Sequence, residues 1–320
     1  MAASRAWRVR ALAKVNISLR VVGVRPDGYH ELRTIFQSIA LHDTLEIRRR
    51  PGPLALHCDD PACPSGESNL VWRAAAALWR ASGRRGAPEG VGLVLTKRIP
   101  MQAGLGGGSS DAVAAIRALG ALWGVDTNRQ RAIALSLGAD LPYFFEGGAV
   151  LGLDRGDRLF PLAEGPVRHV VLVKPAFGVS TRDAFGWWDR AAEKGRPSSQ
   201  APRGDHALGP DTGNDLERFV ARHHPEIRRI AVALQEAGAC YAGMSGSGSV
   251  VFGLFDTRAH ADAAKARVEG NVEGNVEGNE GKGRRAWLSR TVNRAAYRRL
   301  AAIPAGRIHL PFALRRLGPS

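Results

Sequence analysis

The 320-residue chain is poor in cysteine and methionine, with three of each, and it lacks a long apolar segment. Cys58, Cys63 and Cys240 are too few and too irregularly spaced for a disulfide framework. Cys58 and Cys63 also lack the second cysteine pair that a structural zinc site needs. No apolar run reaches the roughly 18–20 residues that cross a bilayer, and the arginine-rich first residues contain no apolar stretch of a signal peptide. We therefore expect a cytoplasmic protein that does not interact with membranes.

Acidic residues are also scarce, and the 45 Lys and Arg against 30 Asp and Glu give a net charge of +15. Nine arginines and no acidic residue lie between residues 284 and 320, so this segment holds well over half of the excess. The remainder is mildly basic, which suits an enzyme that acts on anions. A nucleic-acid-binding module without catalysis is the alternative that charge allows. Because no RNA-reading motif with interleaved aromatic residues is present, we expect no nucleic-acid partner.

Length and composition favour a soluble α+β protein of two domains. Periodicity predicts strands over residues 11–22, 34–47 (with a break at His42-Asp43), 91–99, 167–173 and 249–255. It predicts helices over residues 69–81, 112–123, 128–137 and 225–238. We place a first domain at 1–160 and a second at 161–298, followed by a basic tail at 299–320 that we expect to be flexible. The composition of 193–213 indicates a long surface loop, and the tandem Val-Glu-Gly-Asn repeat indicates a flexible insertion near 268–283.

The segment Pro-Met-Gln-Ala-Gly-Leu-Gly-Gly-Gly-Ser-Ser at 100–110 directly precedes a predicted helix. Its glycines let backbone N–H groups approach an anion, and the start of a helix favours phosphate. The segment lacks the lysine of a Walker P-loop and the Gly-x-Gly-x-x-Gly spacing of a dinucleotide site. It is therefore a different kind of phosphate loop, with a plain helix-capping turn as the alternative.

Other polar residues have an ordinary and a functional interpretation. Lys14, Asn16 and Ser18 alternate along one face of a strand, which is either simply solvated or a row of functional groups. Asp140 lies in a Gly-Ala-Asp-Leu-Pro turn, where aspartate is commonly just a turn former. A second loop of small residues, from Ala242 to Ser249, is either a bare turn or a further phosphate contact.

Five motifs together resemble the GHMP kinase superfamily over about residues 8–297. They are the glycine-rich segment through Asp111, Ala-Lys-Val-Asn at 13–16, Arg-Pro-Asp-Gly-Tyr-His at 25–30, Gly-Ala-Asp-Leu-Pro at 138–142 and Gly-Ser-Gly-Ser-Val-Val-Phe at 246–252. The resemblance implies the two-domain GHMP kinase fold, with a ribosomal protein S5 domain 2-like N-terminal domain, a ferredoxin-like C-terminal domain and an active site between them. The insertion and the segment after residue 297 depart from the family pattern.

Within the superfamily, the Asp-Gly-Tyr-His block is similar to kinases that phosphorylate the 2-hydroxyl of a cytidine diphosphate alcohol in isoprenoid precursor synthesis, with ATP and Mg²⁺. By this resemblance Asp140 is the catalytic base, with Lys14 beside it. Residues Pro100, Met101, Gln102, Ala103, Gly104, Leu105, Gly106, Gly107, Gly108, Ser109 and Ser110 bind ATP. Tyr29, His30, Phe185, Asn16 and Thr181 contact the substrate, and the metal ligands are unassigned. A sister kinase of homoserine or phosphomevalonate is the near alternative, and we expect a monomer or a weak homodimer.

Overall fold

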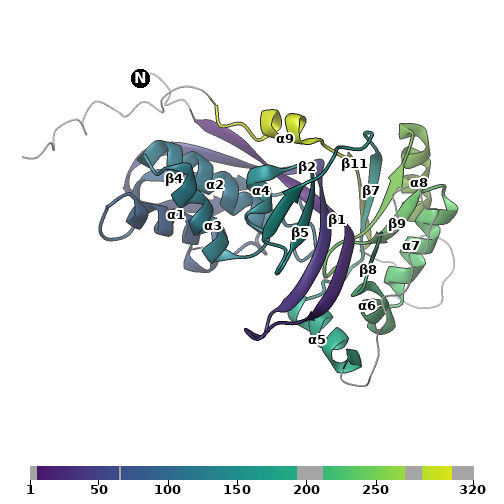
Figure 1. Ribbon diagram of the computed structural model, residues 1–320. Helices are drawn as coiled ribbons and strands as arrows, with labels where there is room; N and C mark the ends of the chain where they lie inside the picture. Colours follow the sequence, from purple (N-terminus) through teal and green to yellow (C-terminus); the bar gives the residue numbers. More distant parts are fainter. Residues whose placement is uncertain (1–5, 65, 193–211, 271–282, 305–320) are drawn as a thin grey trace, which may run out of the picture.

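The computed structural model describes residues 6–64, 66–192, 212–270 and 283–304. Two sheets lie next to each other in the middle of the molecule, with one group of helices outside each sheet (Figure 1). No helix among the described residues has the length and apolar character needed to cross a membrane. Residues 193–211, 271–282 and 305–320, which cover most of the predicted loop, insertion and tail, lie outside the described residues. The division into domains at residues 160 and 298 stays a prediction.

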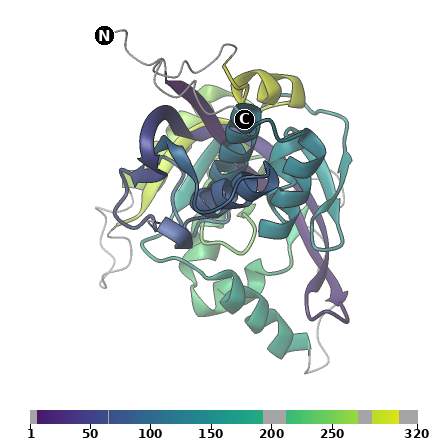
Figure 2. The same ribbon diagram turned by 90° about the vertical axis from the view of Figure 1, so that its left-hand side faces the viewer.

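The larger sheet is formed mainly by the N-terminal half of the chain. Its strands are β1 (Trp7–Val24), β2 (His30–Pro53), β3 (Ala55–Cys58), β4 (Glu89–Thr96), β5 (Ala149–Leu153), β6 (Arg158–Pro161) and β8 (Gly213–Asn214). The strand order is β3-β4-β2-β1-β8, and β5 pairs with β2 and β6. The associated helices are η1 (Gly66–Ser68), α1 (Leu70–Ala81), α2 (Gly107–Trp123), α3 (Thr127–Leu137) and α4 (Tyr143–Glu146). Figure 2 shows these helices, in blue and teal, in front of the long strands.

The predicted break at His42-Asp43 is wrong, because β2 is continuous through both residues. Asp43 is buried, but its carboxylate accepts hydrogen bonds from the backbone of Arg98 and Ile99, so the strand does not have to end there. The irregularity lies just before it. Leu12 pairs with His42 and Lys14 pairs with Ser38. Residues 39–41 of β2 therefore lie opposite the single residue Ala13 of β1 and form a β-bulge.

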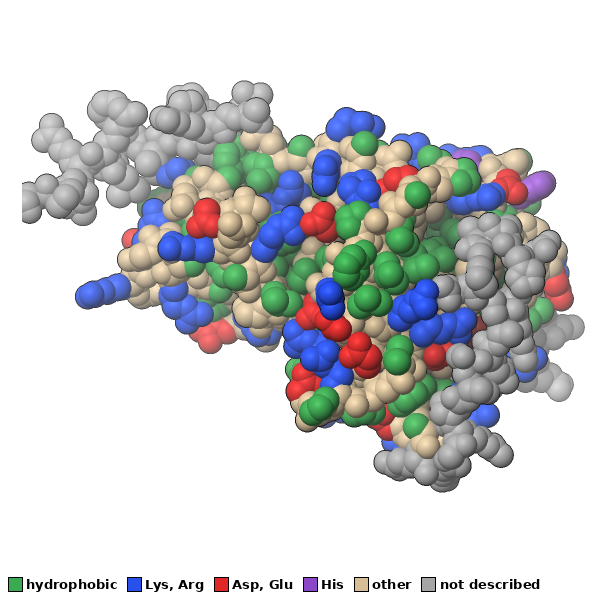
Figure 3. Space-filling model, in the orientation of Figure 1, with side chains coloured by type: hydrophobic (Ala, Val, Ile, Leu, Met, Phe, Trp, Pro, Cys, Tyr) green, Lys and Arg blue, Asp and Glu red, His purple; other side chains and the backbone are tan. Residues whose placement is uncertain are grey.

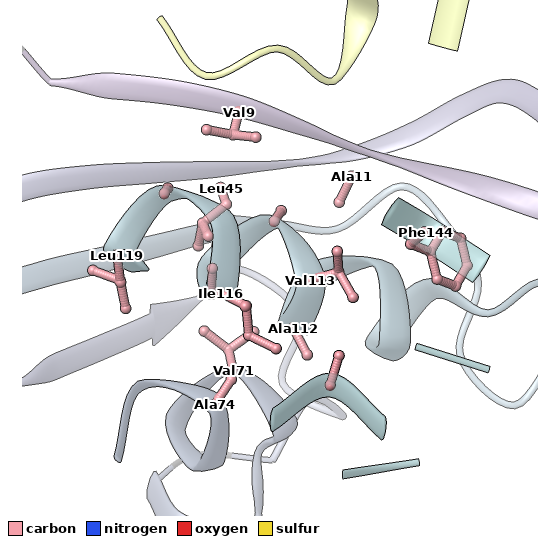
Figure 4. Close-up of a cluster of buried hydrophobic side chains, with 14 of the residues drawn as sticks. Val9, Ala11, Leu45, Val71, Ala74, Ala112, Val113, Ile116, Leu119 and Phe144 are labelled. Atoms are coloured by element: carbon pink, nitrogen blue, oxygen red, sulfur yellow. The ribbon is translucent and has the colours of Figure 1, made fainter. Parts of the chain in front are cut away.

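Helix α2 lies at the centre of the N-terminal core. Its buried Val113, Ile116 and Leu119 pack with residues of the sheet such as Val9 and with residues of α1 (Figure 4). The helix begins after Gly106, which has a φ of 69°, and ends at Gly124, which has a φ of 73°. These left-handed glycines fix both ends of the helix, so its start is held rigidly against the sheet.

The smaller sheet contains β7 (His169–Lys174), β9 (Tyr241–Met244), β10 (Val251–Phe255) and β11 (Arg285–Arg290), in the order β11-β7-β10-β9. All three pairings are antiparallel. Its helices are α5 (Thr181–Ala192), α6 (Glu217–His223), α7 (Glu226–Glu236) and α8 (Arg258–Gly270). The helices that pack on this sheet are α7 and α8, and with them the order β7-α7-β9-β10-α8-β11 is the β-α-β-β-α-β order expected of a ferredoxin-like domain, to which α5 and α6 are added after β7.

The chain finally returns to the N-terminal sheet in α9 (Arg294–Leu300). Val292, Tyr297 and Ala301 pack with Leu12, and the Tyr297 hydroxyl donates to the Phe144 carbonyl at 2.8 Å. The bridge between Ile39 of β2 and Thr291, which directly follows β11, joins the two sheets. Cationic and anionic side chains are interspersed on the face shown in Figure 3, which therefore has no uniformly basic surface.

Candidate active site

A cavity of about 590 Å³ lies between the two sheets. The glycine-rich segment, the middle of β1 and β2, the start of α5 and the loop before β10 surround it. The predicted site residues that line it are Lys14, Asn16, Pro100, Met101, Gln102, Ala103, Gly104, Leu105, Gly106, Gly107, Gly108, Ser109, Asp140, Thr181 and Phe185. Ser110, Tyr29 and His30 are absent from this lining. Ser110 is buried, and its hydroxyl donates to the Leu12 carbonyl at 2.7 Å, so it anchors α2 to β1.

The glycines of the phosphate loop are required by close packing. A Cβ atom on Gly104 would lie 1.9 Å from the Ser245 carbonyl oxygen, and one on Gly106 would lie 2.7 Å from Phe144. Gly106 caps α2 without a side-chain hydrogen bond, so the N–H groups of the first helical turn have no side-chain cap. Gly107, Gly108 and Ser109 line the cavity at this helix start. The arrangement offers backbone donors and a helix dipole to an anion.

Lys14 is buried at the floor of the cavity, where its ammonium has three oxygen neighbours. Its Nζ atom donates to Asn16 Oδ1 at 2.5 Å and to the Gly104 carbonyl at 2.8 Å, and it lies 3.7 Å from Asp140 Oδ2. Burial lowers the pKa of Lys14, and the charge of Asp140 opposes this effect. Asp140 itself is 43% exposed, because it stands in the turn that follows α3. A positive charge and an accessible carboxylate therefore share the cavity.

Asn16 positions Lys14. Its Nδ2 atom donates to Thr34 Oγ1 at 2.8 Å, and its backbone N–H donates to Ser245 Oγ at 3.2 Å. Ser245 in turn donates to the Gly104 carbonyl at 2.9 Å. The polar row expected on β1 therefore connects the strand, the phosphate loop and the second loop of small residues.

The sequence interpretation missed a buried charge cluster beneath the phosphate loop. Lys97 Nζ donates to Asp111 Oδ2 at 2.7 Å and to Asp43, whose other oxygen binds the backbone of residues 98 and 99. Burial acts to lower the pKa of Lys97, but the two carboxylates outweigh it and raise that pKa. Burial and the neighbouring Asp43 raise the pKa of Asp111 well above its ordinary value. The available signal was position, since Asp111 directly follows the glycine-rich segment and Lys97 lies shortly before it.

An aromatic group contributes Phe185 to the cavity wall. The ring centroids of His30 and Phe185 are 4.4 Å apart, and those of His30 and Trp188 are 5.6 Å apart. His30 Nε2 lies 2.7 Å from Asp189 Oδ1, so this nitrogen carries the proton that the carboxylate accepts. The structure thus brings His30 to Phe185, which lines the cavity, and adds Asp189 as a residue that the sequence did not reveal.

Tyr29 and Thr181 are at the mouth of the site. Tyr29 is 57% exposed, and the guanidinium of Arg155 lies over its ring. The distance from Arg155 Cζ to the ring centroid is 5.2 Å. Arg155 lines the cavity and was also missed. Thr181 begins α5, and its hydroxyl lies 3.1 Å from that of Ser247. The Thr181–Ser247 contact joins α5 to the loop before β10 in the wall of the cavity.

The comparisons with known proteins agree with this geometry. Residues 69–148 match the family model described as GHMP kinases N terminal domain, and residues 203–273 match GHMP kinases C terminal. The chain is 42% identical over 253 residues to a 4-diphosphocytidyl-2-C-methyl-D-erythritol kinase of Pelotomaculum thermopropionicum. The aligned region covers 76% of this chain and 87% of that relative. The chain belongs to the 4-diphosphocytidyl-2-C-methyl-D-erythritol kinase family. The resemblance drawn from the sequence motifs is thereby confirmed.

Solved structures support the same conclusion. A crystal structure of 4-(cytidine 5'-diphospho)-2C-methyl-D-erythritol kinase superposes with a TM-score of 0.71 at 35% identity, covering 89% of this chain and 98% of that one. A homoserine kinase of Cytophaga hutchinsonii superposes with a TM-score of 0.64 at 20% identity, covering 92% and 97%, which shows the shared fold alone. The two-domain GHMP kinase fold is therefore confirmed, and this kinase family is favoured over its homoserine-specific sister.

Proposed function

We propose that the protein transfers the γ-phosphoryl group of ATP to the 2-hydroxyl of 4-diphosphocytidyl-2-C-methyl-D-erythritol. The product is the 2-phosphate, an intermediate of the non-mevalonate (MEP) route to isoprenoid precursors. The observation that carries the proposal is one cavity whose lining combines the glycine-rich phosphate loop, the aromatic ring of Phe185 and the Lys14–Asp140 pair. A cytoplasmic location and a monomeric or weakly dimeric state remain predictions.

The glycine-rich segment supplies the ATP site. Backbone N–H groups at the start of α2 bind the phosphates, because glycine leaves no side chain in their way. The buried Lys97–Asp43–Asp111 cluster ties both flanks of the segment together, so the donors keep fixed directions before ATP arrives. Such preorganisation is what stabilises charge that develops during phosphoryl transfer.

Asp140 acts on the acceptor hydroxyl. Its exposed carboxylate accepts the proton of that hydroxyl, and the ammonium of Lys14 stabilises negative charge on the moving phosphoryl group. General base catalysis of this kind contributes roughly 10²–10⁴-fold to the rate. Asn16 does not contact the reacting atoms in this scheme but holds the ammonium of Lys14 in place.

The aromatic end of the cavity binds the cytosine. Phe185 offers a ring face for stacking, and His30 offers its second ring nitrogen to the pyrimidine edge, since Nε2 is held by Asp189. Tyr29, with its ring under Arg155, closes the mouth of the site. Thr181 contributes a hydroxyl at the same mouth.

Mg²⁺ fits the donors that the cavity contains. This ion keeps several waters and binds one or two protein oxygens together with substrate phosphates. Ser109 provides such an oxygen in the lining, and it is the residue that would hold the ion. When bound, the ion neutralises phosphate charge. The described residues contain no group of three His, Cys, Asp or Glu that would form a protein-only metal site.

The test is ATP consumption by the purified protein with Mg²⁺ and 4-diphosphocytidyl-2-C-methyl-D-erythritol. Asp140→Asn keeps the shape of the side chain but removes its basicity, so binding is retained and turnover falls by about 10²-fold or more. Glu236→Gln makes the same chemical change on an exposed residue of α7 and should leave turnover unchanged. Equal turnover by Asp140→Asn and wild type would overturn the role of Asp140. No turnover by wild type with this alcohol would overturn the proposed acceptor.

A further inference from the structure

A second cavity, of about 360 Å³, lies at another junction of the two sheets. Its lining residues are Ala40, Leu41, His42, Arg98, His169, Arg258, Leu288, Ser289 and Arg290. Three arginines and two histidines are among them, and none of these described lining residues is acidic. None of them lines the cavity that contains the phosphate loop.

The fold builds this cavity from both sheets. The bulge in β2 presents residues 40–42, while His169 and Arg290 are cross-strand partners at the ends of β7 and β11. The Leu41 N–H donates to Ser289 Oγ at 3.0 Å, which joins the two sheets at the cavity wall. The basic residues are therefore assembled by tertiary structure from five separate segments of the chain.

The positive charge of the cavity is poorly neutralised. No hydrogen bond or ion pair joins the side chains of Arg98 or Arg290 to any other described residue. Arg258 pairs with Asp262 at 3.2 Å, but it remains 72% exposed. Because like charges close together repel, a concave group of three guanidinium ions with a single acidic partner lowers its free energy by binding an anion.

Helix α8 adds to this attraction. It begins at Arg258, which lines the cavity, and its first turn contains no acidic residue. The positive end of the helix dipole therefore adds to the field of the arginines. His42 donates its Nδ1 proton to the Ala40 carbonyl at 2.8 Å, which fixes the ring.

We propose that this cavity is a second anion site that binds the diphosphate group of a small organic molecule. Three guanidinium groups exceed what one monophosphate needs, and planar guanidinium groups bind phosphate oxygens in pairs. Ala40, Leu41 and Leu288 form an apolar part of the wall, which accommodates a short hydrocarbon chain next to the charged group. Inorganic pyrophosphate and an alkyl diphosphate share the chemistry that the arginines recognise.

The position of this site connects it to the phosphate loop. Arg98 directly follows Lys97, and its backbone N–H binds Asp43. Asp43 therefore lies between the second cavity and the ammonium of Lys97, which faces the ATP side. The proposal concerns binding alone, and it does not depend on the identity of the acceptor alcohol.

Isothermal titration with pyrophosphate, in Mg²⁺-free buffer at constant ionic strength, tests the proposal on the full chain. Pyrophosphate also binds at the phosphate loop, so the measured isotherm contains two binding components. The component that belongs to the second cavity is the one that Arg98→Gln combined with Arg290→Gln removes. We expect this component to weaken at least about 30-fold, because two charge-assisted contacts are lost. Unchanged kinase activity and melting temperature would show that the double variant is folded.

Arg80→Gln combined with Arg299→Gln is the matched control. It removes the same charge from two exposed arginines on α1 and α9, and it should retain the full pyrophosphate isotherm. Identical isotherms for wild type and both double variants would overturn the proposal, as would an equal loss in the two double variants. A five-carbon alkyl diphosphate then separates the two sources. If the alkyl diphosphate binds more tightly than pyrophosphate, the natural ligand of the site is an alkyl ester of diphosphate. If the two bind equally, the ligand is inorganic pyrophosphate.

Discussion

The ammonium of Lys14 lies 3.7 Å from the carboxylate of Asp140 although it comes from the buried centre of β1, whereas Asp140 stands in an exposed turn after α3. Gly104 and Asn16 accept hydrogen bonds from the same ammonium and hold it toward the cavity. The pair thus combines a fixed, desolvated cation with a carboxylate that substrate can reach. That combination stabilises charge in a phosphoryl-transfer reaction.

The buried position of Lys14 predicts an alkaline limb in the pH profile of kcat. Burial lowers its pKa, so the ammonium loses its proton below the ordinary value of about 10.4. Activity should therefore fall with rising pH before an exposed lysine would titrate. Lys14→Met should lower kcat about 10²–10³-fold at neutral pH, which is the usual effect of removing one preorganised hydrogen-bond donor that stabilises a transition state. Lys265→Met, on the surface of α8, serves as the control, and an unchanged kcat for Lys14→Met would contradict the assignment.

Gly107→Val should raise the KM for ATP. A Cβ atom at this position would lie 2.9 Å from Ile99 Cγ2 and 3.5 Å from Lys97 Nζ, so the side chain would displace the start of α2. We expect an increase of about tenfold, equivalent to one charge-assisted hydrogen bond. Gly23→Val is the matched control, because it introduces the same side chain on β1 where no atom lies within 4 Å. Steady-state kinetics with varied ATP check the prediction, and equal KM values for the two variants would count against it.

Local patterns were sufficient for the elements that form the site. The helix expected over residues 69–81, the helix after the phosphate loop and the alternation on β1 all follow from short-range rules, and each is present in the structure. The break predicted at His42-Asp43 was wrong, because the buried carboxylate of Asp43 has partners that keep it within a continuous strand. Its partners at residues 97–99 are more than fifty positions away, which no local pattern records.

The same limit explains what was missed in the site. Lys97 and Arg155 are ordinary surface residues by sequence, and only the packing of separate strands brings them to the cavity. Asp189 lies on α5, and its carboxylate meets His30 across 159 positions. Residues within one motif could be predicted, whereas pairs made by tertiary contact could not.

Asp189→Asn should impair recognition of the cytidine substrate without impairing chemistry. Asp189 holds the proton on His30 Nε2, and the amide would loosen both the ring and its tautomer. We expect the KM for the cytidine substrate to rise about tenfold or less, with kcat and the KM for ATP nearly unchanged. Asp262→Asn, on α8, is the control. A fall in kcat with constant KM would instead place Asp189 in the chemical step.

Lys97→Met should destabilise the fold more strongly than the removal of any exposed lysine. It leaves Asp43 and Asp111 buried together without their cation, and breaking a buried pair in this way costs about 3–5 kcal/mol of unfolding free energy. The pKa of Lys97 is higher in the folded state than in the unfolded state. The contribution of Lys97 to the free energy of unfolding is therefore complete at pH values below the pKa of an ordinary lysine, and it declines as the pH rises through the pKa of Lys97 in the folded state. Urea unfolding at pH 7 measures the difference.

Two further variants separate the charge effect from simple loss of packing. Lys265→Met removes an exposed lysine that pairs with Glu269, and it should cost less than about 1 kcal/mol. Lys97→Met combined with Asp111→Asn also removes the repulsion between the two carboxylates, so it should regain part of the stability lost by Lys97→Met alone. If the double variant were less stable than Lys97→Met by the full cost of a second independent mutation, the two residues would not be coupled. The cluster would then be no more than neighbouring side chains, and the phosphate loop would be held by its glycines and by Ser110 instead.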